Sequence, residues 1–307
     1  MILNVNGATQ AWIANLNYTQ QQINQASAQV SSGLAVTQPS DDPASISAIL
    51  QTQADIAASK QAQSNLTSVG GELQSADTAL QTAVQAVQNA STLAAEGATS
   101  TSTATARVAL AEQVSGLMQT LVGIANTTYN GRYIFSGDDD SSAAYQLDAT
   151  QTNGVLQVSA SSSTRMIQDG AGTTIAVART AQQIFDAKDS SGNNTAGNVF
   201  AAVNSLLTAL TNNDQAGISQ AASSLQSAGQ YLNQQLAFYG EAEDRVTAAA
   251  GLAQKFQTQQ QSKLSNLQDA DIPTVATELT QAQVEQQASL SAEAGIQQQR
   301  NLFSYLG

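Results

Sequence analysis

The residues of this chain that could do chemistry are its carboxylates, because it contains no histidine and no cysteine. Without histidine it lacks the commonest general base and the commonest transition-metal ligand. Without cysteine it has no disulfide, no thiol nucleophile and no thiolate metal site. Every catalytic or metal-binding hypothesis therefore depends on groups of aspartate and glutamate.

The densest acidic group is the run Asp138, Asp139 and Asp140, with Asp148 a short distance further along. Carboxylate oxygens at such a turn could bind Ca²⁺. An EF-hand loop, however, needs alternating ligands, a central glycine and a closing glutamate, and this spacing does not match it. We interpret the run as a solvated acidic turn, and we predict no metal site and no cofactor.

Asp41 and Asp42 form a second group, which could be read as a catalytic carboxylate pair. Pro43 follows directly. An aspartate at the N-cap with proline as the first helical residue is a common start of a helix. No histidine, cysteine or lysine stands close in sequence to assist catalysis. We therefore predict that a helix begins at Pro43, capped by Asp42, and that the chain is not an enzyme.

The elements around these carboxylates are mainly helical. Apolar residues recur at a heptad position through Leu66, Leu73, Leu80, Val87 and Ala94, the spacing of a coiled-coil seam. A similar pattern follows at 110–124, and heptad positions recur from 218 to 267. Alanine rather than leucine dominates the apolar fraction, which suits long helix bundles whose backbones approach closely.

The region after Asn130-Gly131 has a different character. Short β-prone segments separated by glycine, asparagine and serine begin with Tyr133, Ile134 and Phe135. We predict a mainly α fold, a long coiled coil or helical bundle built from both chain ends, with a small β-rich inserted domain. The expected domains are 1–40 with 270–307, 41–131 with 198–269, and 132–197.

The two ends of the chain are poor in charge but amphipathic. The first forty residues contain no charged residue, yet Leu16, Ile23 and Val30 recur every seven positions. Near the other end, apolar residues step by four and three through Val275, Leu279 and Ala282. Chain ends are usually mobile and solvated, so uncharged amphipathic ends indicate burial against copies of the same protein or a close relative. We expect one terminal coiled coil. The other residues that we expect to take part in it are Trp12, Leu279, Leu302, Phe303 and Leu306. Trp12 would be an anchor in the assembled coil and loosely packed in a free monomer.

The net charge of −13 argues against nucleic acid, since phosphate binding needs clustered lysine and arginine. It equally disfavours anionic membrane surfaces. We expect no apolar run to be long enough to span a bilayer. The first residues lack the basic and apolar regions of a secretory signal. Export from the cell would have to use another route.

Three stretches resemble bacterial flagellar axial proteins. Residues 31–44, SSGLAVTQPSDDPA, are similar to a segment shared by flagellins and hook–filament junction proteins. Residues 125–137, ANTTYNGRYIFSG, resemble the hook-associated protein 3 family more than flagellin. The third stretch is DADIP at 269–273 followed by LFSYL at 302–306. The opening residues match either group only loosely.

The resemblance implies a structural protein that forms a ring between another hook-associated protein and the flagellin filament. It also implies an extracellular location, export unfolded through the flagellar type III apparatus with an escorting chaperone, and chain ends that order on assembly. Coupled ordering of this kind suits amphipathic ends, because the cost of ordering is offset only on burial. Flagellin itself is the alternative within the same group.

A function of another class, an acidic adhesin or sensor module or a hydrolase, has less support because histidine, a signal peptide and a membrane helix are missing. Two further residues are assembly or structural candidates. Arg132 is expected to pair with an acidic residue, either within the subunit or across a subunit contact. Phe135 closes the GRYIF motif.

Overall fold

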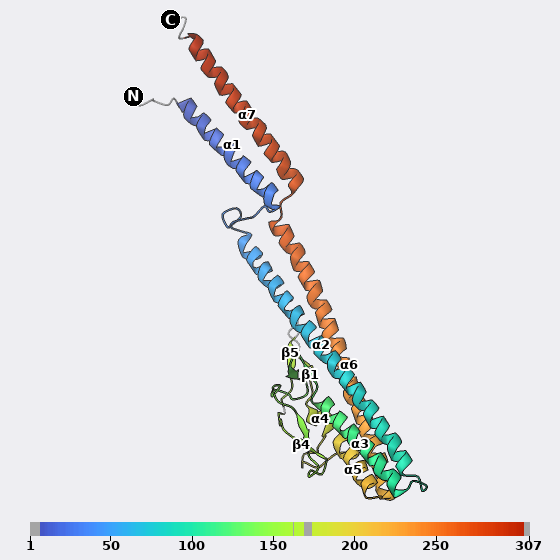
Figure 1. Ribbon diagram of the computed structural model, residues 1–307. Coiled ribbons are helices and arrows are strands. Elements are labelled where there is room, and N and C mark those ends of the chain that lie inside the picture. The colour runs from blue at the N-terminus through green and yellow to red at the C-terminus, as the bar shows by residue number, and fades with distance from the viewer. Residues whose placement is uncertain (1–6, 162, 169–173, 304–307) are drawn as a thin grey trace. The chain divides into compact units, whose positions relative to one another are not determined.

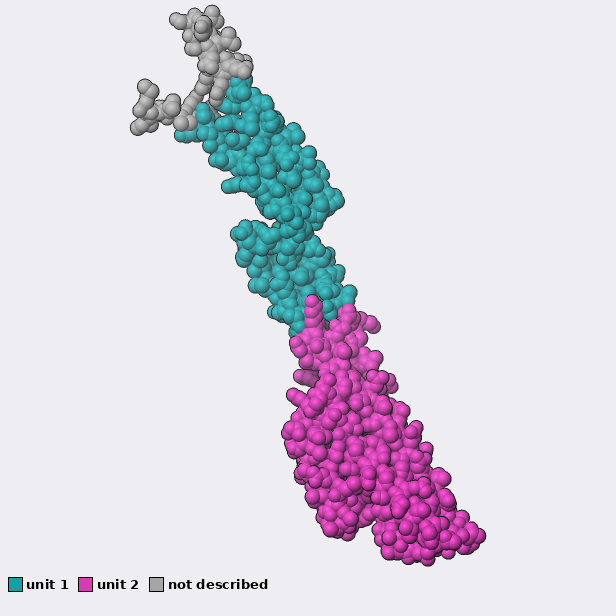
Figure 2. Space-filling view, in the orientation of Figure 1, with its two compact units in different colours: residues 1–58, 256–307 teal, residues 59–255 magenta. Residues whose placement is uncertain are grey.

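The computed structural model describes residues 7–161, 163–168 and 174–303, without the side chains of residues 8 and 296–303. Its residues fall into two compact units (Figure 2), 1–58 with 256–307 (unit 1) and 59–255 (unit 2). Two long helices, α2 (Ile46–Gly97) and α6 (Gln215–Gln268), contribute to both units. The finer division with 132–197 as a domain of its own stays a prediction.

Unit 1 is built on two helices from opposite ends of the sequence, α1 (Gly7–Ser32) and α7 (Ile272–Phe303), which lie side by side (Figure 1). Gly33 ends α1 with φ +75°, the left-handed conformation that glycine adopts most easily at a helix C′ position. Asp271 precedes α7, and its carboxylate accepts a hydrogen bond from the hydroxyl of Thr274 at 2.6 Å.

The helix after Pro43 begins later than expected. Residues 43–45 form a turn, and α2 starts at Ile46. The carboxylate of Asp42 accepts hydrogen bonds from the main-chain N–H groups of Ala44 and Ser45, at 3.1 and 3.3 Å. Asp42 thus caps the turn that leads into the helix, and the prediction of a helix from Pro43 was wrong by one turn.

Unit 2 is a helical bundle that carries three small sheets. Its helices are the parts of α2 and α6 that lie in it, α3 (Ala104–Ala125), the one-turn α4 (Ala181–Phe185) and α5 (Val199–Thr211). The heptad positions predicted on α2 are all buried, as are those on α6 from Ile218 to Val246. The fold class predicted from the sequence, mainly α with a small β-rich region, is confirmed.

Each sheet is a pair of antiparallel strands. β1 (Thr128–Tyr129) pairs with β2 (Arg132–Tyr133) across the Asn130-Gly131 turn, a dipeptide favoured in two-residue hairpins. The other pairs are β3 (Tyr145–Leu147) with β4 (Val155–Gln157), and β5 (Met166–Gln168) with β6 (Thr174–Ala176). The strand expected at 133–135 ends at Tyr133, because Ile134 and Phe135 turn into the core and are buried.

The expectation that no apolar run could span a bilayer needs correction. Residues 104–125, which form α3, are long and apolar enough by length and composition. In the structure α3 packs against α5, and nine of its residues are buried. One of them is Arg107, whose guanidinium donates to the carbonyls of Gly97 and Thr99 and to Oδ1 of Asn213. These contacts are those of a core helix in a bundle.

Candidate assembly site

The contact between α1 and α7 brings together residues that are far apart in the sequence. The indole Nε1 of Trp12 donates to Oγ of Ser289 at 2.9 Å. Three residues before Ser289 on α7, Nε2 of Gln286 donates to Oε1 of Gln20 at 2.7 Å. The described helices from the two ends of the sequence, α1 and α7, therefore pair within a single chain.

Two of the buried apolar residues described in this pair are alanines. These buried residues are Ala26, Val275 and Ala282, and alanine at such positions lets two helices approach closely. The predicted Leu16, Ile23 and Leu279 are half-buried, and so is Trp12. The C-terminal stripe of Val275, Leu279 and Ala282 thus lies on the buried side of α7. On α1 the buried apolar residue is Ala26, which the sequence pattern did not single out.

Other predicted residues of the terminal coil are not buried in the chain or lie outside its description. Val30 is 36% exposed. Leu302 and Phe303 lie at the end of α7, and their side chains are outside the described set, as is Leu306 altogether. Their role as assembly residues stays a prediction.

Apolar side chains on the outside of the helix pair are exposed. The exposed fractions are 43% for Ile13, 61% for Tyr18, 64% for Val284 and 43% for Leu290. The whole of α1 carries no charged residue. A helix pair alone cannot cover apolar residues on all of its sides, so this surface is suited to packing against further helices.

The segments that link these helices to α2 and α6 are joined by backbone hydrogen bonds. The amide of Ala270 donates to the carbonyl of Gly33 at 2.9 Å, and that of Ala35 donates to the carbonyl of Gln268 at 2.7 Å. The side chain of Gln268 adds a bond to the carbonyl of Val36 at 3.2 Å. The two connections are therefore fastened together inside unit 1.

Asp41 and Asp42 each stabilise a turn of their own. Oδ2 of Asp41 accepts hydrogen bonds from the amides of Thr37 and Gln38 and from the Thr37 hydroxyl, at 2.9, 3.0 and 2.9 Å. These donors, the Thr37 amide first, lower the pKa of Asp41 to about 2. The hydroxyl of Ser45 is the main cause of a lowered pKa at Asp42. Both carboxylates are acceptors in turns, which is the structural role expected of them.

Arg132 lies in an ion pair within the chain. Its Nη1 lies 3.2 Å from Oδ2 of Asp140, in an exposed position. The backbone of Asp140 also accepts a hydrogen bond from the amide of Tyr133 at 2.8 Å. Among the residues that the structure describes, no three histidine, cysteine or carboxylate side chains lie close enough to hold a metal ion.

Phe135 is a core residue that fixes the β-rich region to the bundle. It is fully buried and meets the rings of Phe185 and Tyr239 edge to face, with centroids 6.1 Å away in both cases. Aromatic pairs favour this edge-to-face arrangement. Its carbonyl accepts a hydrogen bond from the amide of Ala181, at the start of α4. Phe135 therefore acts through packing rather than as an exposed contact.

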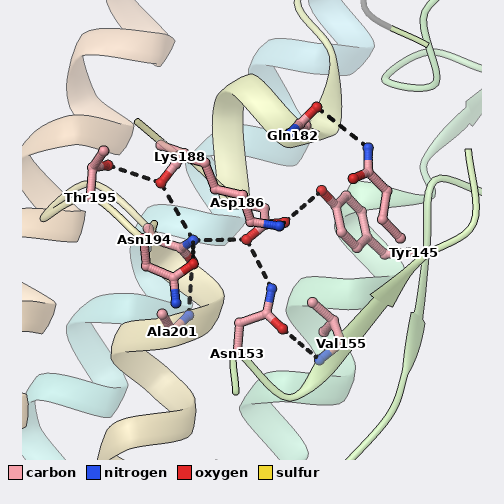
Figure 3. Close-up of polar contacts among 12 residues, drawn as sticks. Tyr145, Asn153, Val155, Gln182, Asp186, Lys188, Asn194, Thr195 and Ala201 are labelled. Carbon is pink, nitrogen blue, oxygen red and sulfur yellow. Dashed lines mark hydrogen bonds and ion pairs between the residues drawn. The ribbon is translucent and has the colours of Figure 1, made fainter. Parts of the chain in front are cut away.

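A buried polar cluster around Asp186 was not predicted (Figure 3). The carboxylate of Asp186 accepts a hydrogen bond from the hydroxyl of Tyr145 at 3.1 Å. It also accepts hydrogen bonds from the side-chain amides of Asn153 and Asn198, at 2.9 and 2.7 Å. Lys188 adds an ion pair at 2.8 Å. Burial, followed by the nearby charge of Asp186, raises the pKa of Tyr145.

This cluster connects β3, the loop before β4, the end of α4 and the start of α5. A buried charge is tolerated when partners satisfy it, and Asp186 has four. Asn198 is the member of this cluster whose position has a local explanation. It caps α5, because its Oδ1 accepts a hydrogen bond from the amide of Ala201 at 2.9 Å. The convergence of the other residues arises only in the folded chain.

Comparisons with known proteins agree with these observations. The family model described as the bacterial flagellin N-terminal helical region matches residues 3–140. Flagellar hook-associated protein 3 of Escherichia coli K12 is 29% identical over 194 residues, which cover 59% of this chain and 58% of that protein. A flagellin of Clostridium tyrobutyricum is 28% identical over 158 residues, covering 49% and 42%. The chain spans about half the length of the curated relatives it matches.

Solved structures show the same fold. The crystal structure of flagellar hook-associated protein 3 from Legionella pneumophila superposes with a TM-score of 0.61 at 14% identity, over 72% of this chain and 98% of that one. This chain carries a flagellin-type N-terminal helical region and is similar to flagellin and to hook-associated protein 3. The resemblance that the sequence motifs indicated is confirmed.

Proposed function

We propose that this chain is a structural axial protein of the bacterial flagellum, located at the junction between the hook and the flagellin filament. The observation that carries the proposal is the helix pair α1–α7, which joins the two ends of the sequence and leaves Ile13, Val284 and Leu290 exposed. The similarity to hook-associated protein 3 supports the same role.

The physical basis is burial on assembly. Removing apolar surface from water contributes roughly 25 cal/mol per Å², and an uncharged α1 adds no penalty for burying charges. Copies that pack their helix pairs around a common axis would gain this burial. The role is mechanical, without catalysis or a cofactor.

The proposed partners follow from this position. Copies of the chain would form a ring, with another hook-associated protein on one side and flagellin on the other. The chain would reach the outside of the cell through the flagellar type III apparatus, escorted by an export chaperone. Its location would be the extracellular part of the flagellum.

Deletion of the gene tests the proposal, with electron microscopy of the cells and analysis of the spent medium. We expect hooks without filaments, and unpolymerised flagellin released outside the cell. Restoration of filaments by the gene supplied in trans is the control. Normal filaments in the deletion strain would contradict the proposal.

Flagellin, the filament subunit itself, is the second candidate, and the match to a flagellin favours it. The same deletion separates the two. Cells that lack filaments and also release no flagellin would identify the chain as flagellin. A purified chain that polymerises by itself into long filaments would give the same answer, since a junction protein should stop at a ring.

A further inference from the structure

Unit 2 contains a groove of about 430 Å³ between α4 and α6 in which cations and aromatic rings meet. Its lining includes Arg179 and Lys188, together with the rings of Tyr231 and Phe238. Lys188 already pairs with the carboxylate of Asp186 at 2.8 Å, so the cation of this groove that remains available is Arg179. The chain has ten lysine and arginine residues against 23 aspartate and glutamate residues, and an available cation in a groove is therefore a local exception on an acidic protein.

Arg179 is held in this groove by groups that carry no charge. Its guanidinium lies 4.2 Å from the centre of the Phe238 ring, a cation–π contact. Nη1 donates to Oε1 of Gln235 at 2.6 Å, and Gln235 is buried with 2% of its surface exposed. The backbone amide of Arg179 donates to the hydroxyl of Tyr239 at 3.1 Å. The position of the cation is therefore fixed before any ligand arrives.

The other arginine side chains that the structure describes are already occupied. Arg132, Arg165 and Arg245 each lie in an ion pair with a carboxylate, and Arg107 is buried against carbonyl groups. Arg179 is half-buried, and no carboxylate of the described residues lies within ion-pair distance of it. Guanidinium groups bind carboxylates through two parallel hydrogen bonds, and the edge of Arg179 away from Gln235 offers the donors for this.

We propose that the groove at Arg179 binds a carboxylate side chain of a second copy of this chain, an inference that rests on the proposed function. Neighbouring copies each carry a net charge of −13 and repel one another, so a contact that places a carboxylate on an unpaired arginine offsets this repulsion locally. A groove on one copy and a carboxylate elsewhere on the next make a head-to-tail contact, the type that closes rings.

Cross-linking in assembled flagella tests this proposal, because the chain has no native cysteine. Ala187, which lines the groove, is replaced in the variant Ala187→Cys and labelled with a benzophenone maleimide. The exposed Thr78 on α2 gives the control variant Thr78→Cys. We expect light to produce a covalent dimer of this chain from position 187, at least tenfold more than from position 78.

The dimer must also depend on the cation. In the Arg179→Glu background the yield should fall at least tenfold, while Arg179→Lys, which keeps the charge, should retain part of it. Circular dichroism spectra and urea midpoints that match those of the unmodified chain show that the purified variants fold. If Arg179→Glu does not fold, Arg179→Gln takes its place. The proposal would be overturned if the dimer yield did not depend on Arg179. It would also be overturned if position 187 cross-linked only to another protein or formed no cross-link.

The two proposals fail in different ways. Normal filaments after deletion of the gene would remove the proposed function and this inference with it. If deletion abolishes filaments as expected but the groove fails these tests, only the inference is wrong.

Discussion

The indole nitrogen of Trp12 donates a hydrogen bond to Oγ of Ser289, 277 positions later in the sequence, at a distance of 2.9 Å. This bond ties α1 to α7 in a pair whose described residues include few buried apolar side chains. The N–H group of Trp12 therefore contributes to holding the pair together.

The Trp12 bond predicts how the two ends respond to substitution. Trp12→Phe keeps most of the apolar ring but removes the donor, which should cost about 1 kcal/mol of local stability. We expect amide exchange in both α1 and α7 to accelerate, with that in α3 unchanged. The exposed Tyr18 provides the control Tyr18→Phe, which should leave exchange unaltered. Faster exchange in α1 alone would contradict the pairing.

Truncation before Val275 tests the same pair in the cell. We expect the shortened chain to retain a soluble, folded unit 2, because none of the core residues described for that unit belongs to α7. It should fail to join the flagellum, since α1 then lacks its partner. Circular dichroism and limited proteolysis check the fold, and a motility assay checks assembly. Normal motility would contradict the role proposed for the terminal helices.

Gly71 and Tyr129 predict an unusual effect of alanine in a helix. A Cβ at position 71 would overlap the hydroxyl of Tyr129. Alanine normally stabilises a helix interior by about 1 kcal/mol relative to glycine, but Gly71→Ala should destabilise unit 2, by roughly 1–3 kcal/mol as expected for overpacking. Urea unfolding of the full chain measures the change.

The neighbouring Gly70 is a matched control for this substitution. Its added Cβ would meet only Cγ1 of Val246, at 3.9 Å, so Gly70→Ala should be neutral or stabilising. Combining Gly71→Ala with Tyr129→Phe removes the hydroxyl and should recover part of the loss. If positions 70 and 71 respond alike, the close approach of Tyr129 is not what sets the effect.

The cluster at Asp186 should be important for the stability of unit 2. Asp186→Asn leaves Lys188 without its carboxylate and presents an amide to the donor groups of Asn153 and Asn198. Lys188 is exposed and can be solvated, so the cost comes from the buried hydrogen-bond donors that lose a charged acceptor, about 1–3 kcal/mol. Asp189→Asn, at an exposed turn, should cost far less. Equal urea midpoints for the two variants would contradict the structural role of the cluster.

The turn at Asp41 predicts a specific behaviour in acid. The donors from Thr37 and Gln38 lower the pKa of Asp41 from 3.8 to about 2. A carboxyl group with a lowered pKa in the folded state contributes stability that is complete above pH 4 and is lost as the pH falls through about 2. The turn should therefore open between about pH 4 and pH 2.

Nuclear magnetic resonance titration of the Asp41 carboxyl in the full chain measures this pKa directly. Thr37→Val removes the hydroxyl donor and should raise the pKa, although the main-chain donors of Thr37 and Gln38 remain. A midpoint near the ordinary aspartate value in the unmodified chain would mean that the turn does not form in solution.

The apolar periodicity of the sequence was sufficient to predict the long helices. The heptad Leu66, Leu73, Leu80 predicted the buried face of α2, because an apolar repeat near the helical period requires a buried stripe wherever the helix packs. The pairing of α1 with α7 followed from low charge at both ends. Asp42 and Pro43 indicated a local capping contact, and Asp42 does cap a turn, but the helix begins only at Ile46.

The sequence did not determine contacts between residues distant along the chain. Asp186 meets Tyr145, Asn153 and Asn198 only after four segments fold together, and nothing in their spacing indicates it. Arg179 became a candidate binding residue because every other described arginine either pairs with a carboxylate or is buried against carbonyl groups, which is a property of the whole fold. Local patterns thus decided the elements, their caps and the pairing of the ends. Tertiary structure alone decided which polar groups are satisfied, because a side chain's hydrogen-bond partners depend on positions in space rather than on order in the chain.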